Sequence, residues 1–242
     1  MDSGAKLYNF DSRQWTWEEL TAHLDKVERK AFVKGKGRIF RTLPAISGTD
    51  VLDVGCNAGL LSHYLARKGH RVVGIEINPE LVEICRRRYP DHPRLTFLVN
   101  GPEALEFPEN SFDCAVALEV LEHVRQPWSF LSELSRVLRP GGTLVISVPN
   151  AASLRVLLKS ALINMPRRFG EMDGWSDYFS DQRDHVYLWD IFTLYRLLSL
   201  KGFRYRMHDF VDSNSFFNFT ARILPPIRRF SSSFLIKVVL EK

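Results

Sequence analysis

From residue 51 onward, short apolar runs alternate with segments in which apolar residues recur every three to four positions. The runs predict buried strands, and the recurring pattern predicts amphipathic helices. Strand alternating with helix at this spacing predicts an α/β fold: a doubly wound, Rossmann-like sheet, mostly parallel with an antiparallel terminal strand, and helices on both faces. The expected strands are 51–54, 72–77, 95–99, 114–118, 143–148, about 203–211 and 233–240; the expected helices include 60–65, one starting at Asn78-Pro79, 128–138 stopped by Pro140-Gly141-Gly142, and one capped by Asp190 and ended by Gly202.

Two further segments frame this core. Thr16 and Glu19 have the spacing of a capping box, and Leu20 and Leu24 follow at helical spacing, which predicts an amphipathic helix. We therefore expect a helical extension over residues 1–48 and a main domain over 49–242, with an insertion or lid at about 151–183.

The first strand leads into a glycine-bearing turn. Asp53, Gly55 and Gly59 lie where the backbone must come close to a ligand and where helix N–H groups point outward. Glu76 ends the next strand, a position suited to a carboxylate that grips the two hydroxyls of a ribose. Asn57 occupies the middle of the turn, where it tolerates a positive φ better than other non-glycine residues.

These motifs resemble those of the class I S-adenosylmethionine-dependent methyltransferases over residues 49–211, nearest to the ubiquinone-biosynthesis O-methyltransferase type. The other matching motifs are Gly74-Ile75-Glu76, residues 107–113, residues 118–124 and residues 138–142. The resemblance implies S-adenosylmethionine as cofactor, with Asp53 at its amino-acid end and Glu76 at its ribose. The expected cofactor-binding residues are Asp53, Gly55, Cys56, Asn57, Gly59, Glu76, Ile77, Asn100, Gly101 and Glu119. A dehydrogenase with this fold is the alternative, but an NAD enzyme would be expected to have glycine at position 57.

Candidate catalytic residues follow the 114–118 strand. Glu119, Glu122 and His123 would share one face if the chain turned helical there. Together with His185 they could hold Mg²⁺ or another divalent cation, which would lower the pKa of an acceptor hydroxyl. Alternatively, His123 or His185 is a metal-free general base, or catalysis rests on proximity alone.

The insertion is expected to build the acceptor site. Trp175, Tyr178 and Phe179 could line an apolar pocket for a small-molecule or lipid-like acceptor. Peripheral membrane contact through residues 151–183 would use Arg155, Lys159, Arg167 and Arg168. In the conservative interpretation, residues such as Leu154, Val156, Leu157, Leu162 and Ile163 only fasten a lid to the core.

Composition narrows the setting. The 33 basic and 28 acidic residues give a net charge of +5, a modest imbalance that does not favour a nucleic-acid partner. Three cysteines without paired spacing fit a reducing compartment. No apolar run reaches the roughly 20 residues of a membrane span, and the first ten residues do not have the pattern of a signal peptide. We therefore expect a cytoplasmic protein, and the alternative is a cytoplasmic protein that associates with a membrane through the insertion.

We therefore expect O-methylation of a small hydroxyl acceptor, lipidic or glycosidic in character. Two alternatives stay open. The first is an RNA ribose methyltransferase, because a branch that methylates small RNAs has two glutamates and a histidine spaced like Glu119, Glu122 and His123, and a later histidine placed like His185 before Trp189. The second is a non-catalytic cofactor-binding subunit that supports a partner enzyme.

Overall fold

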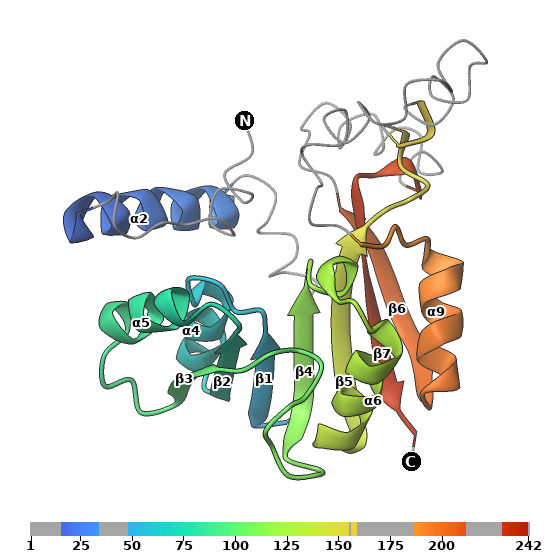
Figure 1. Ribbon diagram of the computed structural model, residues 1–242, viewed down its shortest axis with the longest axis horizontal. Helices are drawn as coiled ribbons and strands as arrows, with labels where there is room; N and C mark the ends of the chain where they lie inside the picture. Colours follow the sequence, from blue (N-terminus) through green and yellow to red (C-terminus); the bar gives the residue numbers. More distant parts are fainter. Residues whose placement is uncertain (1–15, 34–47, 155, 159–185, 212–228, 242) are drawn as a thin grey trace.

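The computed structural model describes residues 16–33, 48–154, 156–158, 186–211 and 229–241, without the side chains of 27–33 and 211. Seven strands form one sheet in the order β3-β2-β1-β4-β5-β7-β6 (Figure 1). Strands β1 to β5 pair in parallel, and β7 is antiparallel to both of its neighbours, which confirms the predicted fold class. The strands are β1 Asp50–Val54, β2 Arg71–Glu76, β3 Leu95–Val99, β4 Phe112–Leu118, β5 Leu138–Pro149, β6 Phe203–Val211 and β7 Ser233–Leu240.

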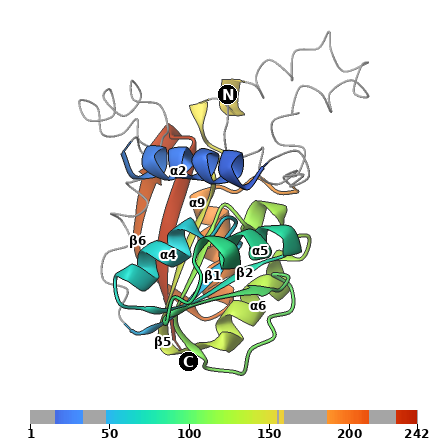
Figure 2. The ribbon, with the colours of Figure 1, turned by 90° about the vertical axis from the view of Figure 1, so that its left-hand side faces the viewer.

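Helices cover both faces of this sheet. Alternate residues of a strand face opposite sides, so Val51 packs with α4 while Leu52 belongs to the core shared with α6 and α9. Figure 2 shows α4 and α5 on the near side of the sheet, with α2 lying above them. The helices are α2 Trp17–Val33, α4 Leu60–Arg67, α5 Pro79–Arg88, α6 Pro127–Val137 and α9 Ile191–Leu200.

The predicted helix starts are confirmed by their caps. The Asn78 side chain accepts a hydrogen bond from the Glu80 N–H at 2.9 Å, and Pro79 begins α5. Asp190 accepts from the N–H groups of Phe192 and Thr193 at 2.9 and 3.0 Å. Both caps satisfy N–H groups that lack a partner inside the helix.

The predicted end of α6 is wrong. The helix stops at Val137 and β5 begins at Leu138, before Pro140-Gly141-Gly142. The cause is the neighbouring strand: Leu138 pairs with Phe112, and the register then shifts to Cys114–Thr143. The proline and glycines therefore lie in an irregular stretch of strand, which is where such residues are tolerated inside a sheet.

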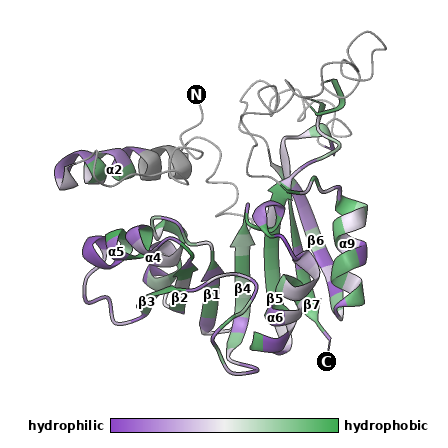
Figure 3. Ribbon diagram, viewed as in Figure 1, coloured by the Kyte–Doolittle hydropathy of each residue, from purple (hydrophilic) through white to green (hydrophobic). Residues whose placement is uncertain are grey.

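The core is concentrated in the central strands, where hydrophobic residues dominate (Figure 3). Leu52, Ala115, Leu144 and Ile146 are fully buried. In the part of the chain that is described, no helix combines the length and the apolar character needed to cross a bilayer. The boundary between an extension and a main domain at residue 49 stays a prediction.

Candidate functional site

The turn after β1 has the geometry that its glycines predict. Gly55, Asn57 and Gly59 have φ angles of 68°, 49° and 76°, so the asparagine adopts the positive φ expected of it. A Cβ atom on Gly55 would come 2.7 Å from Val120, and one on Gly59 would come 2.7 Å from the Phe97 ring. Both positions therefore require glycine, because of the positive φ and because a neighbouring side chain leaves no room for a Cβ atom.

Glu76 lies at the carboxyl end of β2, beside this turn. Its side chain is buried, with 7% exposed. Oε2 accepts from the Asn57 N–H at 3.1 Å, and Oε1 accepts from the N–H groups of Ile77 and Asn78 at 2.9 and 3.2 Å. The backbone thus holds this carboxylate in place, as an acceptor for ribose hydroxyls requires, and Oε2 keeps capacity for a further donor.

Asp53 points away from solvent. It is 3% exposed, and Ser62 Oγ donates to its Oδ2 at 2.5 Å. Burial, together with the nearby charge of Glu76, raises the pKa of Asp53 to about 7. Cys56 also turns inward, because its thiol packs with Val82, Cys85 and Phe97. The contacts expected of Asp53 and Cys56 with the cofactor stay predictions.

Three residues next to Glu76 offer a surface for a flat, partly polar ring. Ile77 is 66% exposed although it is apolar, and a Cβ built on Gly101 would meet no atom within 4 Å. The side-chain oxygen of Asn100 is buried and has no hydrogen-bond partner among the described residues. An adenine ring would pack on the apolar Ile77 side chain and fill the open space at Gly101. Its amino group would donate a hydrogen bond to the unsatisfied Asn100 oxygen. The residues present therefore fit a nucleoside cofactor.

The predicted common face of Glu119, Glu122 and His123 is wrong. Only Leu121–His123 forms a turn, a single 3₁₀ turn (η2), and Glu119 precedes it with a φ of 56°. Glu119 accepts from Ser147 Oγ at 2.9 Å and from Ser233 Oγ at 3.4 Å. Residues three and four apart share a face only within a helix, and this short turn does not include Glu119. The spacing therefore does not place Glu119 on one face with Glu122 and His123.

Glu122 and His123 differ sharply in exposure. The Glu122 side chain is 1% exposed, and neither of its oxygens has a hydrogen-bond partner in the described structure. Burial, and secondly the charge of Glu119, raises its pKa well above the usual value of a glutamate. His123 keeps 21% of its side chain exposed, with Nε2 at 3.9 Å from Glu122 Oε1. His123 is thus the more accessible group of the two.

The described residues contain no group of three His, Cys, Asp or Glu side chains that could hold a metal ion. His185, the remote ligand and alternative base, lies outside the described residues. Described residues alone therefore do not form the predicted cation site.

The two ends of the insertion meet at one place. Asn150 forms an isolated bridge with Trp189, and the Ala151 N–H donates to the Trp189 carbonyl at 2.8 Å. The N–H of Val186 donates to the Glu122 carbonyl at 2.8 Å, which ties the returning chain to the turn that carries His123. Three sets of predicted residues lie outside the described residues: Trp175, Tyr178 and Phe179 for the pocket, Arg155, Lys159, Arg167 and Arg168 for membrane contact, and Leu162 and Ile163 for the lid.

Of the residues expected to fasten a lid to the core, Leu154 and Leu157 are 49% and 44% exposed, whereas Val156 is partly buried. The interpretation of the insertion as a lid stays a prediction. Sequence reasoning also missed Ser147 and Asn150, both buried at the carboxyl end of β5. Their signal was available: a polar side chain in or directly after an apolar strand must find a partner, and Asn150 finds it in the carbonyls of Arg229 and Ser231.

Comparison with known proteins agrees with this geometry. Residues 52–146 match the family model described as a methyltransferase domain. The chain is 32% identical over 154 residues to the mitochondrial ubiquinone biosynthesis O-methyltransferase of Schizosaccharomyces pombe, covering 61% of this chain and 55% of that protein. It is 39% identical over 108 residues to the ubiquinone biosynthesis O-methyltransferase of Xanthomonas campestris pv. campestris, covering 44% and 45%. The chain thus spans about half the length of these curated relatives.

A solved structure shows the same fold. The S-adenosylmethionine-dependent methyltransferase from Mesorhizobium loti superposes with a TM-score of 0.63 at 17% identity, over 84% of this chain and 96% of that one. The sheet order and the glycine turn with its glutamate agree with the family match: residues 52–146 of this chain are similar to a methyltransferase domain.

Proposed function

We propose that this protein transfers the methyl group of S-adenosylmethionine to a hydroxyl oxygen of a small, lipidic acceptor of the quinone-precursor type. The observation that carries the proposal is the carboxylate of Glu76, fixed by three backbone N–H groups beside a positive-φ glycine turn. Both relatives are named as ubiquinone biosynthesis O-methyltransferases, which supports a quinone precursor as the class of acceptor.

The cofactor half of the site would work as follows. Bound S-adenosylmethionine supplies a methyl group that its sulfonium has already activated. The Glu76 carboxylate accepts hydrogen bonds from the ribose hydroxyls, and Ile77 packs against the face of the adenine ring. The unsatisfied side-chain oxygen of Asn100 accepts a hydrogen bond from the adenine amino group. The turn at Gly55 to Gly59 lets the backbone approach the cofactor closely. Asp53, which is buried beneath the turn, would help to hold the amino-acid end of the cofactor.

The acceptor half needs a group that removes a proton. A hydroxyl oxygen becomes a stronger nucleophile as its proton leaves, and a phenolic hydroxyl, with a pKa near 10, gives it up more readily than an alcohol does. His123 is suited to this task because it is partly exposed and because η2 fixes its backbone: its N–H donates to the Val120 carbonyl at 3.0 Å. We assign His123 the role of general base.

A divalent cation would need ligands beyond those that the described residues bring together. Titrating the purified enzyme with Mg²⁺ or Mn²⁺, and assaying it in a chelator, separates the two routes. Full turnover in the chelator supports proton removal by His123 without a cation. Turnover that returns only with added metal would assign that step to a cation site instead.

Membrane contact is a second part of the proposal, because a lipidic acceptor resides in a bilayer. Leu157 and Leu158 are 44% and 56% exposed at the start of the insertion, and Leu188 is 50% exposed at its end. The double variant Leu157→Glu, Leu158→Glu should bind less to anionic liposomes in a flotation assay. Leu200→Glu, a change of equal kind on the 65% exposed Leu200 at the end of α9, is the control and should bind as the unmodified protein does.

The decisive experiment for the function is direct turnover. The purified chain is incubated with labelled S-adenosylmethionine and a panel of catechols and prenylated phenols, and products are identified by mass spectrometry. O-methylated product formed by the chain alone supports the proposal and excludes a purely supporting subunit. Cofactor binding without methylation of any phenol would overturn the acceptor class, and absence of cofactor binding would overturn the whole proposal.

A further inference from the structure

Helix α2 packs directly against the cofactor-binding turn. Leu20 and Leu24 are 4% and 3% exposed and share an apolar cluster with Ala58, Leu81 and Ile84. Ala58 lies between Asn57 and Gly59 within the turn itself, while Leu81 and Ile84 belong to α5. The same two leucines of α2 thus belong to the cluster that joins the turn to the helix following Glu76.

Polar contacts fix α2 to α5 at two separate points. The Arg87 guanidinium lies 4.0 Å from the centre of the Trp17 ring, and Arg88 pairs with Asp25 at 2.6 Å. Trp17 and Asp25 are about 12 Å apart along the helix axis at 1.5 Å per residue. Contacts spread over this length hold α2 along α5 and disfavour rotation about a single point.

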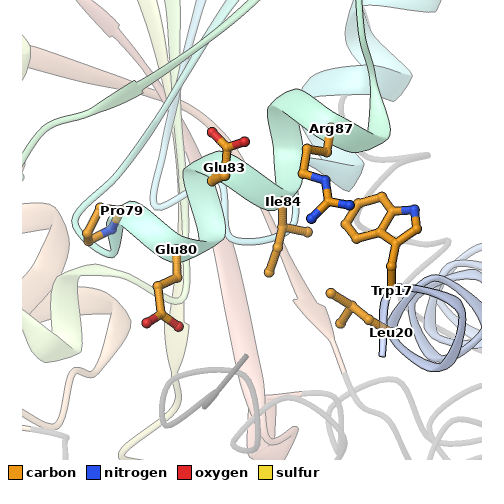
Figure 4. Close-up of a pocket in the computed structure, with 7 residues that line it drawn as sticks. All are labelled: Trp17, Leu20, Pro79, Glu80, Glu83, Ile84 and Arg87. Carbon is orange, nitrogen blue, oxygen red and sulfur yellow. The ribbon is translucent and has the colours of Figure 1, made fainter. Parts of the chain in front are cut away.

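The junction is nonetheless incompletely packed. A cleft of about 380 Å³ remains between the two helices, lined on α2 by Trp17 and Leu20 and on α5 by residues from Pro79 to Arg87 (Figure 4). Beside this cleft, α2 contacts the rest of the protein through the apolar cluster of Leu20 and Leu24 and the two polar contacts of Trp17 and Asp25.

We propose that α2 positions the cofactor site: Leu20 and Leu24 hold Ala58 and α5 in the arrangement that binds S-adenosylmethionine. The inference rests on the proposed cofactor and adds residues outside its motifs to the binding machinery. Leu20 and Leu24 are positioning residues, because they act on the cofactor through Ala58 and α5.

Thermodynamic linkage makes this inference testable from both directions. If a docked α2 strengthens cofactor binding, then bound cofactor strengthens α2 docking by the same factor. Couplings between sites commonly amount to about 5- to 150-fold. Leu20→Ala and Leu24→Ala should therefore weaken binding of S-adenosylhomocysteine, the demethylated product, by about tenfold in calorimetry. The Michaelis constant for the cofactor should rise accordingly, with kcat at saturating cofactor changed less than twofold.

A matched control separates positioning from general loss of stability. Leu198→Ala removes the same atoms from a fully buried leucine of α9, which packs on the other face of the sheet. This variant should lose thermal stability and keep the affinity for S-adenosylhomocysteine. If Leu198→Ala weakens binding as much as Leu24→Ala does, the effect is one of stability and the inference is wrong.

The unmodified protein supplies an independent measurement. Hydrogen exchange of the amides in residues 17–26 should slow when S-adenosylhomocysteine is added, because bound ligand stabilises the docked helix. Unchanged exchange together with unchanged affinity of the leucine variants would overturn the inference while leaving the proposed function intact. Failure of the unmodified protein to bind the ligand at all would instead overturn the proposed function.

Discussion

The carboxyl edge of the sheet has two halves that are built in different ways. Beside β1 and β2, each buried carboxylate has partners: Glu76 accepts from three backbone N–H groups and Asp53 from Ser62. Beside β4 and β5, Glu122 is more deeply buried than either, and its oxygens have no hydrogen-bond partner among the described residues. In the first half both carboxylates are satisfied and the Asn100 oxygen is left for a ligand, whereas in the second half the Glu122 carboxylate itself has no partner among the described residues.

This difference separates two tasks. A site whose groups are already held by the backbone loses little freedom on binding, which suits a cofactor that is the same in every turnover. Glu119 and Glu122 instead lie where the insertion leaves and returns to the sheet, tied to it through the Glu122 carbonyl and Val186. Under the proposed function, the first half would hold the cofactor and the second half would hold the acceptor.

The largest expected effect tests the second half alone. His123→Ala removes the proposed general base and should lower kcat by about 10²- to 10⁴-fold. Its affinity for S-adenosylhomocysteine should stay within twofold of the unmodified value, because Glu76 and the glycine turn are unchanged in this variant. His208→Ala, on the exposed face of β6, is the control and should leave both quantities unchanged. Equal losses in kcat and in affinity would show that the halves are not separate.

The complementary change tests the first half. Glu76→Ala removes the carboxylate that orders the turn and accepts the ribose hydroxyls, so the dissociation constant of S-adenosylhomocysteine should rise roughly 100-fold, about 2.7 kcal/mol. Calorimetry measures this directly. Glu83→Ala removes a carboxylate of the same kind from the exposed face of α5 and should change affinity little. Unaltered binding by Glu76→Ala would contradict its assigned role.

The two halves also differ in how well the sequence predicts them. The turn from Gly55 to Gly59, the glutamate ending β2 and the caps at Asn78 and Asp190 are local patterns, and each was placed correctly. Their geometry depends on residues a few positions apart, so spacing alone carries the information.

The second half depends on contacts between distant segments. Glu119 is held by Ser147 and Ser233, which lie 28 and 114 residues away in the chain. No spacing rule links such residues, and the apparent helical spacing of Glu119, Glu122 and His123 was misleading. The same holds for α2, whose contact with Ala58 joins segments that only the fold brings together.

A glycine substitution can show how strongly the first half depends on packing. Gly59→Ala places a side chain at a φ of 76° and 2.7 Å from the Phe97 ring, and should lower the free energy of unfolding by roughly 2–4 kcal/mol. Gly69→Ala, at a φ of 102° with no atom within 4 Å, carries only the backbone strain and should cost about 1–2 kcal/mol. Urea unfolding measures both. Equal costs would mean that Phe97 moves aside freely and that the turn is not rigidly packed.

The smallest effect concerns the buried acid behind the turn. The pKa of Asp53 is about 7 in the folded protein, against about 3.9 in an unfolded chain. The folded state therefore binds this proton more tightly, so its contribution to stability is complete below about pH 4 and is lost as the pH rises through 7. Asp53→Asn keeps an acceptor for Ser62 and removes the titration.

Relative to the unmodified protein, this variant should gain roughly 2–3 kcal/mol in unfolding free energy between pH 5 and pH 8, most of it below pH 7. Asp50 and Asp113, whose pKa values are lowered, act in the opposite sense, but both remain in the variant and cancel in the difference. If the difference in unfolding free energy between the two proteins does not change from pH 5 to pH 8, Asp53 is ionised over this whole range. The buried carboxylate would then carry a charge despite its burial.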